Sequence, residues 1–118
     1  MTLFDSTSLV LQKAMSGAAM RQSVLSSNLA NANTPGYVRK DVDFHSTLNE
    51  ALGAGDSGLA DVSFTPQTDA AAAVRQDGNT VDVDREAAEL AANGLEYQAL
   101  VSVAQGRISI IQSALGVR

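Results

Sequence analysis

Cysteine and tryptophan are absent from this chain, and no stretch of it approaches the roughly 20 consecutive apolar residues of a membrane-spanning helix. The missing cysteine excludes disulfides and thiolate metal sites. The first residues, Met1-Thr2-Leu3-Phe4-Asp5, contain neither the basic nor the apolar segment of a cleaved secretory signal peptide. If the protein acts outside the cytoplasm, we therefore expect it to leave by another export route.

Aromatic residues are also scarce, at 4% of the 118 residues, and acidic residues outnumber basic ones. The 13 acidic and 8 basic residues give a net charge of −5, which argues against a nucleic-acid partner, because such a partner usually requires a basic patch. A chain of this length holds one domain. Since large side chains contribute most of a core's stability, we expect either that its helices pack on one another or that partner subunits complete the core.

A heptad pattern predicts a long helix over about residues 5–31, with Asp5 or Ser6 as its N-cap. We expect Pro35-Gly36 to stop this helix, because Pro35 disfavours a helical residue before it and the pair suits a type II turn. The seam positions alternate in steps of four and three residues, with one polar interruption: Leu11, Met15, Ala18, Gln22, Leu25, Leu29 and Ala32.

The middle of the chain, about residues 34–83, has no helical period. We expect an extended arm over residues 37–44 that packs on a neighbouring subunit, because Tyr37, Val42 and Phe44 have no evident partner in their own chain. Beyond the arm, the sequence fits one or two helical turns at residues 46–52, a flexible linker at 53–58, short strands at 62–66 and 80–83, and a turn at 77–79. So long an irregular region is uncommon in a compact domain, so it is either functional or ordered by a partner.

A second, stronger heptad pattern predicts a helix over about residues 84–115, with Asp84 as its N-cap and Gly116 just after its end. The two helices can pair as a parallel or an antiparallel coiled coil, because the segment between them can span either arrangement. We expect that the seams pack the core and that the seams or their flanks also bind neighbouring copies. The second seam consists of Leu90, Gly94, Tyr97, Val101, Ala104, Ile108, Ile111 and Leu115.

No group of residues in the sequence predicts catalysis. His45 is the only histidine, and its neighbours lack the sequence that surrounds a catalytic serine. The acidic pairs at residues 41 and 43 and at 82 and 84 lack the glycine and distal glutamate of a calcium loop, and the glycines of residues 53–58 lack the strand and the Lys-Ser/Thr of a phosphate loop. We therefore expect no cofactor, no metal and no small-molecule substrate.

The end of the first helix carries a resemblance to a known family. Residues 25–37 read Leu-Ser-Ser-Asn-Leu-Ala-Asn-Ala-Asn-Thr-Pro-Gly-Tyr, and a charged run follows at residues 39–44. This resembles the signature of the rod and hook proteins of the flagellar axial family. Residues 78–86 and 95–101 are similar to a proximal rod protein, and Tyr37 follows Gly36 without the insertion expected in the sister protein FlgC. Residues 46–77 carry none of the resemblance.

The resemblance implies a structural component of the bacterial flagellar proximal rod, with a mainly α fold and no enzymatic activity. Residues 1–33 and 84–118 would form the coiled-coil domain of the inner tube, and residues 34–83 an arm, a linker and short strands. The chain would polymerise into a periplasmic drive shaft after export by the flagellar type III apparatus. Its partners would be FlgC, FlgF, FliE, the inner-membrane ring with its export gate, and neighbouring copies.

We expect the subunit interfaces to use the helix-end motif, the arm and the second seam. The asparagine amides of the motif would satisfy backbone groups of a neighbour. Two alternatives stay open, a coiled-coil adaptor that does not polymerise and a wall hydrolase that uses His45 or the pair Asp41/Asp43. The expected interface residues are Asn28, Asn31, Asn33, Pro35, Gly36, Tyr37, Val42, Phe44, Leu90, Tyr97, Val101, Ile108, Ile111 and Leu115.

Overall fold

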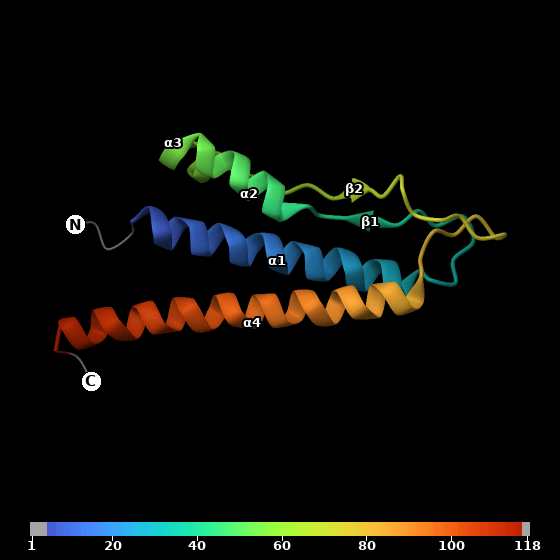
Figure 1. Cartoon of the computed structure of the whole chain (residues 1–118). Coiled ribbons are helices and arrows are strands. Elements are labelled where there is room, and N and C mark those ends of the chain that lie inside the picture. Colours follow the sequence, from blue (N-terminus) through green and yellow to red (C-terminus); the bar gives the residue numbers. More distant parts are fainter. Residues whose placement is uncertain (1–4, 117–118) are drawn as a thin grey trace.

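The computed structural model describes residues 5–116, so the outermost residues of the two expected helical segments, 1–4 and 117–118, lie outside it. The fold is mainly α, which confirms the expected class (Figure 1). The molecule is long and flat, 62 × 32 × 14 Å along its principal axes. In chain order the elements are α1 (Ser6–Ala30), β1 (Lys40–Asp41), α2 (Phe44–Gly53), α3 (Gly55–Asp61), β2 (Gln67–Thr68) and α4 (Val83–Ala114).

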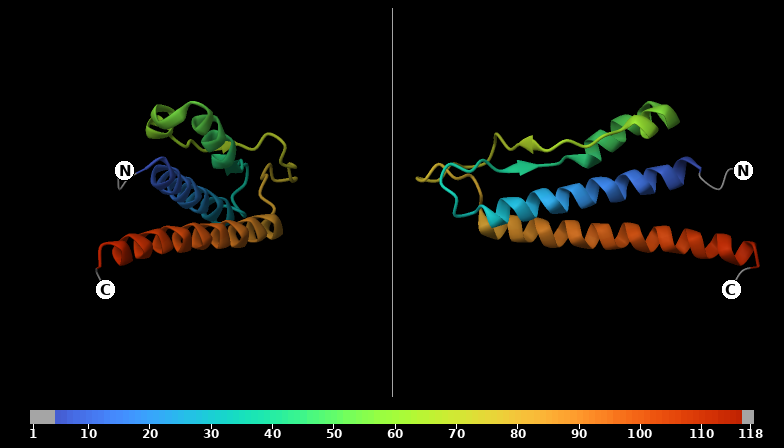
Figure 2. Two further views of the ribbon diagram at one scale, coloured as in Figure 1. Left: turned by 60° about the vertical axis from the view of Figure 1, so that its left-hand side comes forward. Right: turned by 180° about the vertical axis from the view of Figure 1, so that it is seen from behind.

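The two long helices, α1 and α4, lie side by side and run in opposite directions (Figures 1 and 2). The pairing that the sequence left open is therefore antiparallel. The segment between them returns along α1, so that α2, α3 and the strands form a further layer over this helix. The loops that connect the strands to the long helices gather at one end of the molecule, and the described ends of the chain lie at the other.

Helix α1 begins and ends close to the predicted positions. The Asp5 side chain accepts a hydrogen bond from the Ser8 N–H and is the N-cap. The helix ends at Ala30, where the Asn31 N–H bonds to the carbonyls of Ser27 and Asn28. Proline therefore does not stop the helix, which is already closed before Pro35 is reached.

Pro35 and Gly36 form a separate turn after the helix. The Tyr37 N–H donates to the Thr34 carbonyl at 3.2 Å, and Gly36 has a φ of +75°, a value that L side chains rarely adopt. This geometry confirms the predicted type II turn. Its role is to reverse the chain direction so that the following residues run back along α1.

Helix α4 starts at Val83, and its N-cap lies two residues before the predicted one. Its N-cap is Asp82, whose carboxylate accepts the N–H groups of Asp84 and Arg85, so the proposed cap Asp84 already lies within the first turn. At the other end Gly116 follows the C-cap with a φ of +70°, as expected for a residue after a helix.

The middle of the chain is more ordered than its composition predicts. The short helix near residues 46–52 is present as α2, and the turn near Gly78 is confirmed by a φ of +80° and an N–H bond to the Arg75 carbonyl. The expected linker is wrong, because residues 55–61 form α3, which is anchored by the buried Leu59. The expected strands at 62–66 and 80–83 are also wrong, since the strand pair is β1 with β2.

The arm folds back onto its own chain. Val42 and Phe44 are 2% and 1% exposed, and they pack with Ala18 of α1 in the main apolar cluster. Gly17 leaves the room for Phe44, because a Cβ at residue 17 would lie 2.7 Å from the Phe44 Cβ. The expectation that these arm residues lack an intrachain partner is therefore wrong. The apolar pattern of the sequence does not reveal this contact with α1, because Gly17 contributes no apolar side chain to the pattern.

The fully buried positions of α4 are polar, which the heptad count did not anticipate. Glu86 and Asn93 are both 0% exposed, whereas the expected seam residues Ile108 and Leu115 are 55% and 70% exposed. Asn93 donates to the Ala18 carbonyl and to Gln22 Oε1. A count of apolar residues cannot detect such positions, because burial of a polar group depends on partners that only the tertiary structure supplies.

Candidate assembly surfaces

The motif at the end of α1 is held by side chains of its own chain. Asn28 is fully buried, and its amide pairs with the backbone of Lys40: Nδ2 donates to the Lys40 carbonyl at 2.6 Å and Oδ1 accepts the Lys40 N–H at 3.1 Å. The Tyr37 hydroxyl donates to the same Oδ1 at 3.2 Å. The Asn28 amide thus acts as a β-strand partner for the arm and fixes it against α1.

A second asparagine, Asn79 of the distant turn, satisfies the carbonyls at the helix end. Its Nδ2 lies 2.9 Å from the Asn31 carbonyl and 2.7 Å from the Thr34 carbonyl. Arg75 adds a bond of 3.0 Å to the Ala32 carbonyl. The hypothesis that motif amides serve a neighbouring subunit is therefore wrong for Asn28, and the free carbonyls of the helix end are used within the chain.

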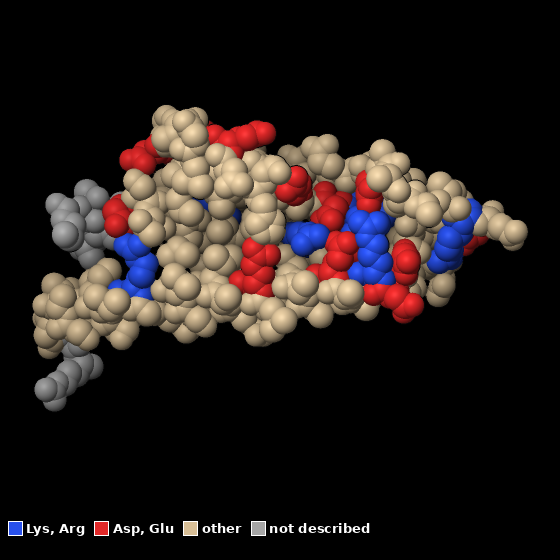
Figure 3. All heavy atoms as spheres, viewed as in Figure 1, with Lys and Arg blue, Asp and Glu red and all other residues tan. Residues whose placement is uncertain are grey.

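A network of charges, which we call the clamp, joins the arm to both long helices. Arg39 is 1% exposed and binds Glu86 of α4, which is 0% exposed. Arg39 also contacts Asp69 at 2.8 Å. Figure 3 shows these charges gathered over the strands and the start of α4. The complete clamp consists of Arg21, Arg39, Asp41, Asp69, Arg85, Glu86 and Glu89.

The clamp changes the acidity of Asp41. Burial alone would raise the pKa of this carboxyl, but hydrogen bonds from Arg21 and from the Val42 N–H, with the charges of Arg21 and Arg39, outweigh burial and hold the pKa below its usual range. Arg21 reaches the carboxylate at 2.8 Å and also binds Glu89 at 2.7 Å. The ionised form of Asp41 is thus favoured in the folded state.

We expect the protein to lose stability in acid in a way that depends on Asp41. A carboxyl whose folded pKa lies below its unfolded value stabilises the fold above the unfolded pKa, here 3.8, and loses this contribution as the pH falls through the folded pKa. The melting temperature should therefore fall below about pH 4. In Asp41→Asn the melting temperature should depend less steeply on pH. Circular dichroism from pH 3 to pH 7 would measure the melting temperatures of both proteins. Equal slopes for the two proteins would contradict the assignment.

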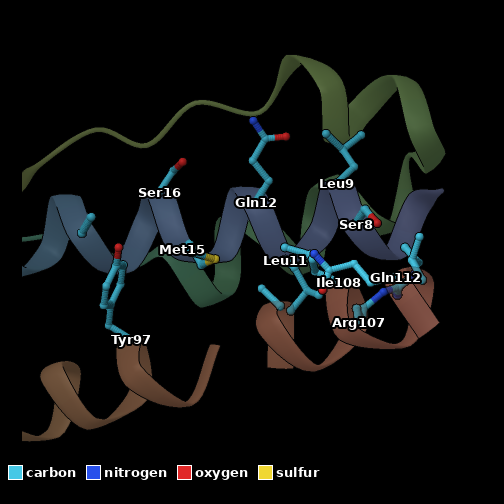
Figure 4. Close-up of a pocket in the computed structure, with 13 residues that line it drawn as sticks. Ser8, Leu9, Leu11, Gln12, Met15, Ser16, Tyr97, Arg107, Ile108 and Gln112 are labelled. Carbon is cyan, nitrogen blue, oxygen red and sulfur yellow. The ribbon is translucent and has the colours of Figure 1, made fainter. Parts of the chain in front are cut away.

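The opposite end of the helix pair carries an apolar groove with a volume of about 970 Å³. It lies between the first half of α1 and the second half of α4, and Figure 4 shows Leu11 and Met15 of α1 facing Tyr97 and Ile108 of α4. The one charged residue that lines it is Arg107, which is paired with Asp5 at 3.0 Å. That pair also contributes to holding the pKa of Asp5 below its usual range, after the stronger effect of the Ser8 N–H.

A second apolar surface, which we call the stripe, runs along the outside of α4. It presents Leu95, Val103 and Ile110, which are 68%, 53% and 70% exposed. Between residues 97 and 116 the only charged residue is Arg107, and Figure 3 shows this end of α4 as almost free of charge. A water-facing helix of a monomer normally has a charged outer face, so the stripe and the groove are the candidate assembly surfaces.

The expected interface residues fall into three groups. The first group is covered within the subunit: Asn28, Val42 and Phe44 are buried, and Leu90 and Val101 are half-buried on α4. Asn33, Pro35 and Gly36 are exposed at the helix-end turn, beside the half-buried Asn31 and Tyr37. The third group lines or adjoins the groove: Tyr97, Ile108, Ile111 and Leu115.

Sequence reasoning missed both the clamp and the stripe. The sequence shows Arg39 only as part of a charged run and does not mark Glu86 as its partner, because their contact joins residues 47 positions apart. The stripe did leave a signal, namely that Arg107 is the only charged residue between residues 97 and 116. The residues of the heptad seam lie on a different side of the helix from the stripe.

The residues that the sequence offered as candidates for catalysis, among them His45 and Asp43, make structural contacts. His45 is half exposed at the start of α2, stacked on Phe44, with Nε2 2.6 Å from Glu96 Oε1. Asp43 caps α2 by accepting the Ser46 N–H. Within residues 5–116 no three acidic or histidine side chains are placed to hold a metal ion. The same residues include no helix with the length and hydropathy to cross a bilayer.

Comparison with known proteins gives one consistent result. A family model described as flagella basal body rod protein matches residues 9–37, which include most of α1 and the turn. The chain is 39% identical to the flagellar basal body rod protein FlgB of Aeromonas hydrophila, over 95% of this chain and 94% of that protein. It is 34% identical to FlgB of Bacillus subtilis, over 98% and 97% of the two chains, and 34% identical to FlgB of Escherichia coli, over 88% of each.

Proposed function

Because the chain belongs to the FlgB family of flagellar basal body rod proteins, we propose that it polymerises through α1 and α4 into the tubular drive shaft of the proximal rod. Its role as a component of the basal body rod follows from the family, whose name describes a structural part rather than an enzyme. The polymerisation is our inference, and the uncharged surface of the two terminal helices carries it.

Exposing these apolar side chains to water costs free energy in a subunit that has no neighbours. Burial of apolar area is worth about 25 cal/mol per Å², and an exposed Val, Leu or Ile gains about 1.5–3 kcal/mol when it becomes fully buried. Leu95 and Ile110 of α4 and its C-cap residue Leu115 are each at least 68% exposed. The two cations of α1 are used within the chain, since Lys13 binds the carbonyls at the end of α3 and Arg21 belongs to the clamp. Neighbouring copies would bury what the monomer leaves exposed.

The same reasoning suggests that different segments of the chain have different places in the rod. Residues 1–33 and 84–118 would form the tube, and residues 34–83 its outer part. The clamp keeps that outer part on its own subunit, because it ties Arg39 of the arm to Glu86 of α4. Adjacent copies can then meet through the helices without the arm having to exchange between chains.

Assembly in the rod places the protein next to other flagellar proteins. We propose that it meets FlgC, FlgF and FliE and adjoins the inner-membrane ring and its export gate. We also propose that it reaches the periplasm through the flagellar type III apparatus. The lack of cysteine in its sequence fits this route, since no disulfide has to form after export.

Sedimentation velocity of the purified chain at rising concentration tests the polymerisation, with and without FliE or FlgC. Polymerisation predicts sedimentation coefficients that keep rising with concentration, because heterologous contacts do not close. An adaptor that does not polymerise predicts a plateau at a small, fixed stoichiometry with its partner. A plateau in every mixture would therefore reject the proposed function in favour of the adaptor.

A further inference from the structure

The groove and the stripe lie at the same height along α4 and have the same length. The groove extends from Tyr97 to Gln112 and the stripe from Leu95 to Ile110. At 1.5 Å per residue each covers about 22 Å of helix. Successive residues of a helix are separated by about 100° of rotation, so Ile110 points well away from its neighbour Ile111, which lines the groove. One helix therefore presents a convex apolar edge on one side and borders a concave apolar site on another.

The groove offers no free charge to a binding partner, so it favours an uncharged helix surface. Its one charged lining residue, Arg107, is already neutralised by Asp5. A charged helix that entered the groove would lose its hydration without gaining an opposite charge. The stripe meets this requirement between Val103 and Ile110, since the one charged residue of that segment, Arg107, lines the groove, and Glu96 beside Leu95 is paired with His45. The pair at the mouth of the groove would then form a polar rim around an apolar centre, the usual arrangement of a protein interface.

We propose that the groove of one copy receives the stripe of a second copy, so that adjacent subunits pack side by side with Val103 and Ile110 inserted between α1 and α4 of the neighbour. This inference rests on the proposed polymerisation and adds which surfaces meet. The two surfaces are different, so the contact is heterologous, and each added subunit offers a free stripe or a free groove to the next. The chain would therefore have a donor side and an acceptor side, at equal height along the helix pair.

Complementary defective variants test this pairing. Ile110→Asp blocks the stripe and Ile108→Asp blocks the groove, and both positions are at least half exposed in the monomer, so folding should be preserved. Gln105→Asp introduces the same charge at an exposed position of α4 outside both surfaces and is the matched control. Each protein would be examined by sedimentation velocity in the condition, with or without FliE or FlgC, in which the unsubstituted chain associates.

The expected result is that each blocked variant needs at least about tenfold higher concentration to associate, while Gln105→Asp behaves like the unsubstituted chain. An equimolar mixture of the two blocked variants should form a 1:1 dimer, because one intact stripe meets one intact groove. Unchanged association of Ile110→Asp, or a mixture that stays monomeric, would overturn the pairing and leave the proposed polymerisation standing. An unsubstituted chain that associates in neither condition would overturn both.

Discussion

Replacing Arg39 by methionine should lower the free energy of unfolding by about 3–5 kcal/mol, because it removes one partner of a buried ion pair. Glu86 would remain fully buried without its cation, and Asp69 would lose a contact of 2.8 Å. Methionine keeps much of the volume, so the loss reports the uncompensated charge rather than a cavity. Urea denaturation followed by circular dichroism would measure it.

The matched control for this prediction is Arg85→Met. Arg85 contacts two carboxylates of the same clamp, Asp69 at 3.5 Å and Glu89 at 2.9 Å, but its side chain is 48% exposed. Ion pairs of exposed side chains are worth about 0–1 kcal/mol, so this variant should differ little from the unsubstituted chain. If the two substitutions cost the same, burial does not determine the strength of the clamp and the interpretation fails.

The second large effect is expected at Phe44, where Phe44→Ala should cost about 3–5 kcal/mol. The ring is 1% exposed, lies in the main apolar cluster and meets Phe64 edge-on with ring centres 6.3 Å apart. Removing it leaves a cavity between the arm and α1. Thermal and urea denaturation would report the loss, and a cost below about 1 kcal/mol would mean that the arm does not pack as described.

Gly17 provides an independent test of the same contact. Alanine is normally favoured over glycine inside a helix by about 1 kcal/mol, yet a Cβ at residue 17 would lie 2.7 Å from Phe44 Cβ and 2.8 Å from its Cγ. Gly17→Ala should therefore destabilise the protein, and somewhat less so when combined with Phe44→Ala, since the contact with Cγ is then absent while the contact with Cβ, which alanine keeps, remains. Gly106→Ala is the control, because nothing lies near that position, and it should be stabilising. A stabilising Gly17→Ala would contradict the close packing.

The clamp and the uncharged surfaces occupy different parts of the molecule, and this separation has a functional meaning. At the end with the strands, charged and amide side chains hold the arm and the turn to the long helices. At the other end, the helix pair leaves apolar side chains exposed. In the proposed rod, the clamp would hold the outer part within each subunit, and neighbouring copies would cover the apolar surfaces of the helix pair.

Local sequence was sufficient for the features that depend on neighbouring residues. The start of α1 at Asp5, the turn at Pro35-Gly36 and the residue after α4, Gly116, follow from side-chain chemistry and backbone preferences within a few positions. The two long helices follow from their apolar periodicity. The helix-end motif also pointed to the flagellar rod family, which the FlgB relatives bear out.

The tertiary structure alone decided the features that depend on distant partners. Antiparallel pairing, the return of Phe44 onto Gly17 and the burial of Glu86 against Arg39 each join residues far apart in the chain. Apolar periodicity cannot register them, because glycine contributes no side chain and a charged residue counts as exposed until its partner is known. The sequence thus determined where the two helices run and to which family the protein belongs. Packing decided which of their faces are buried within the subunit and which stay exposed.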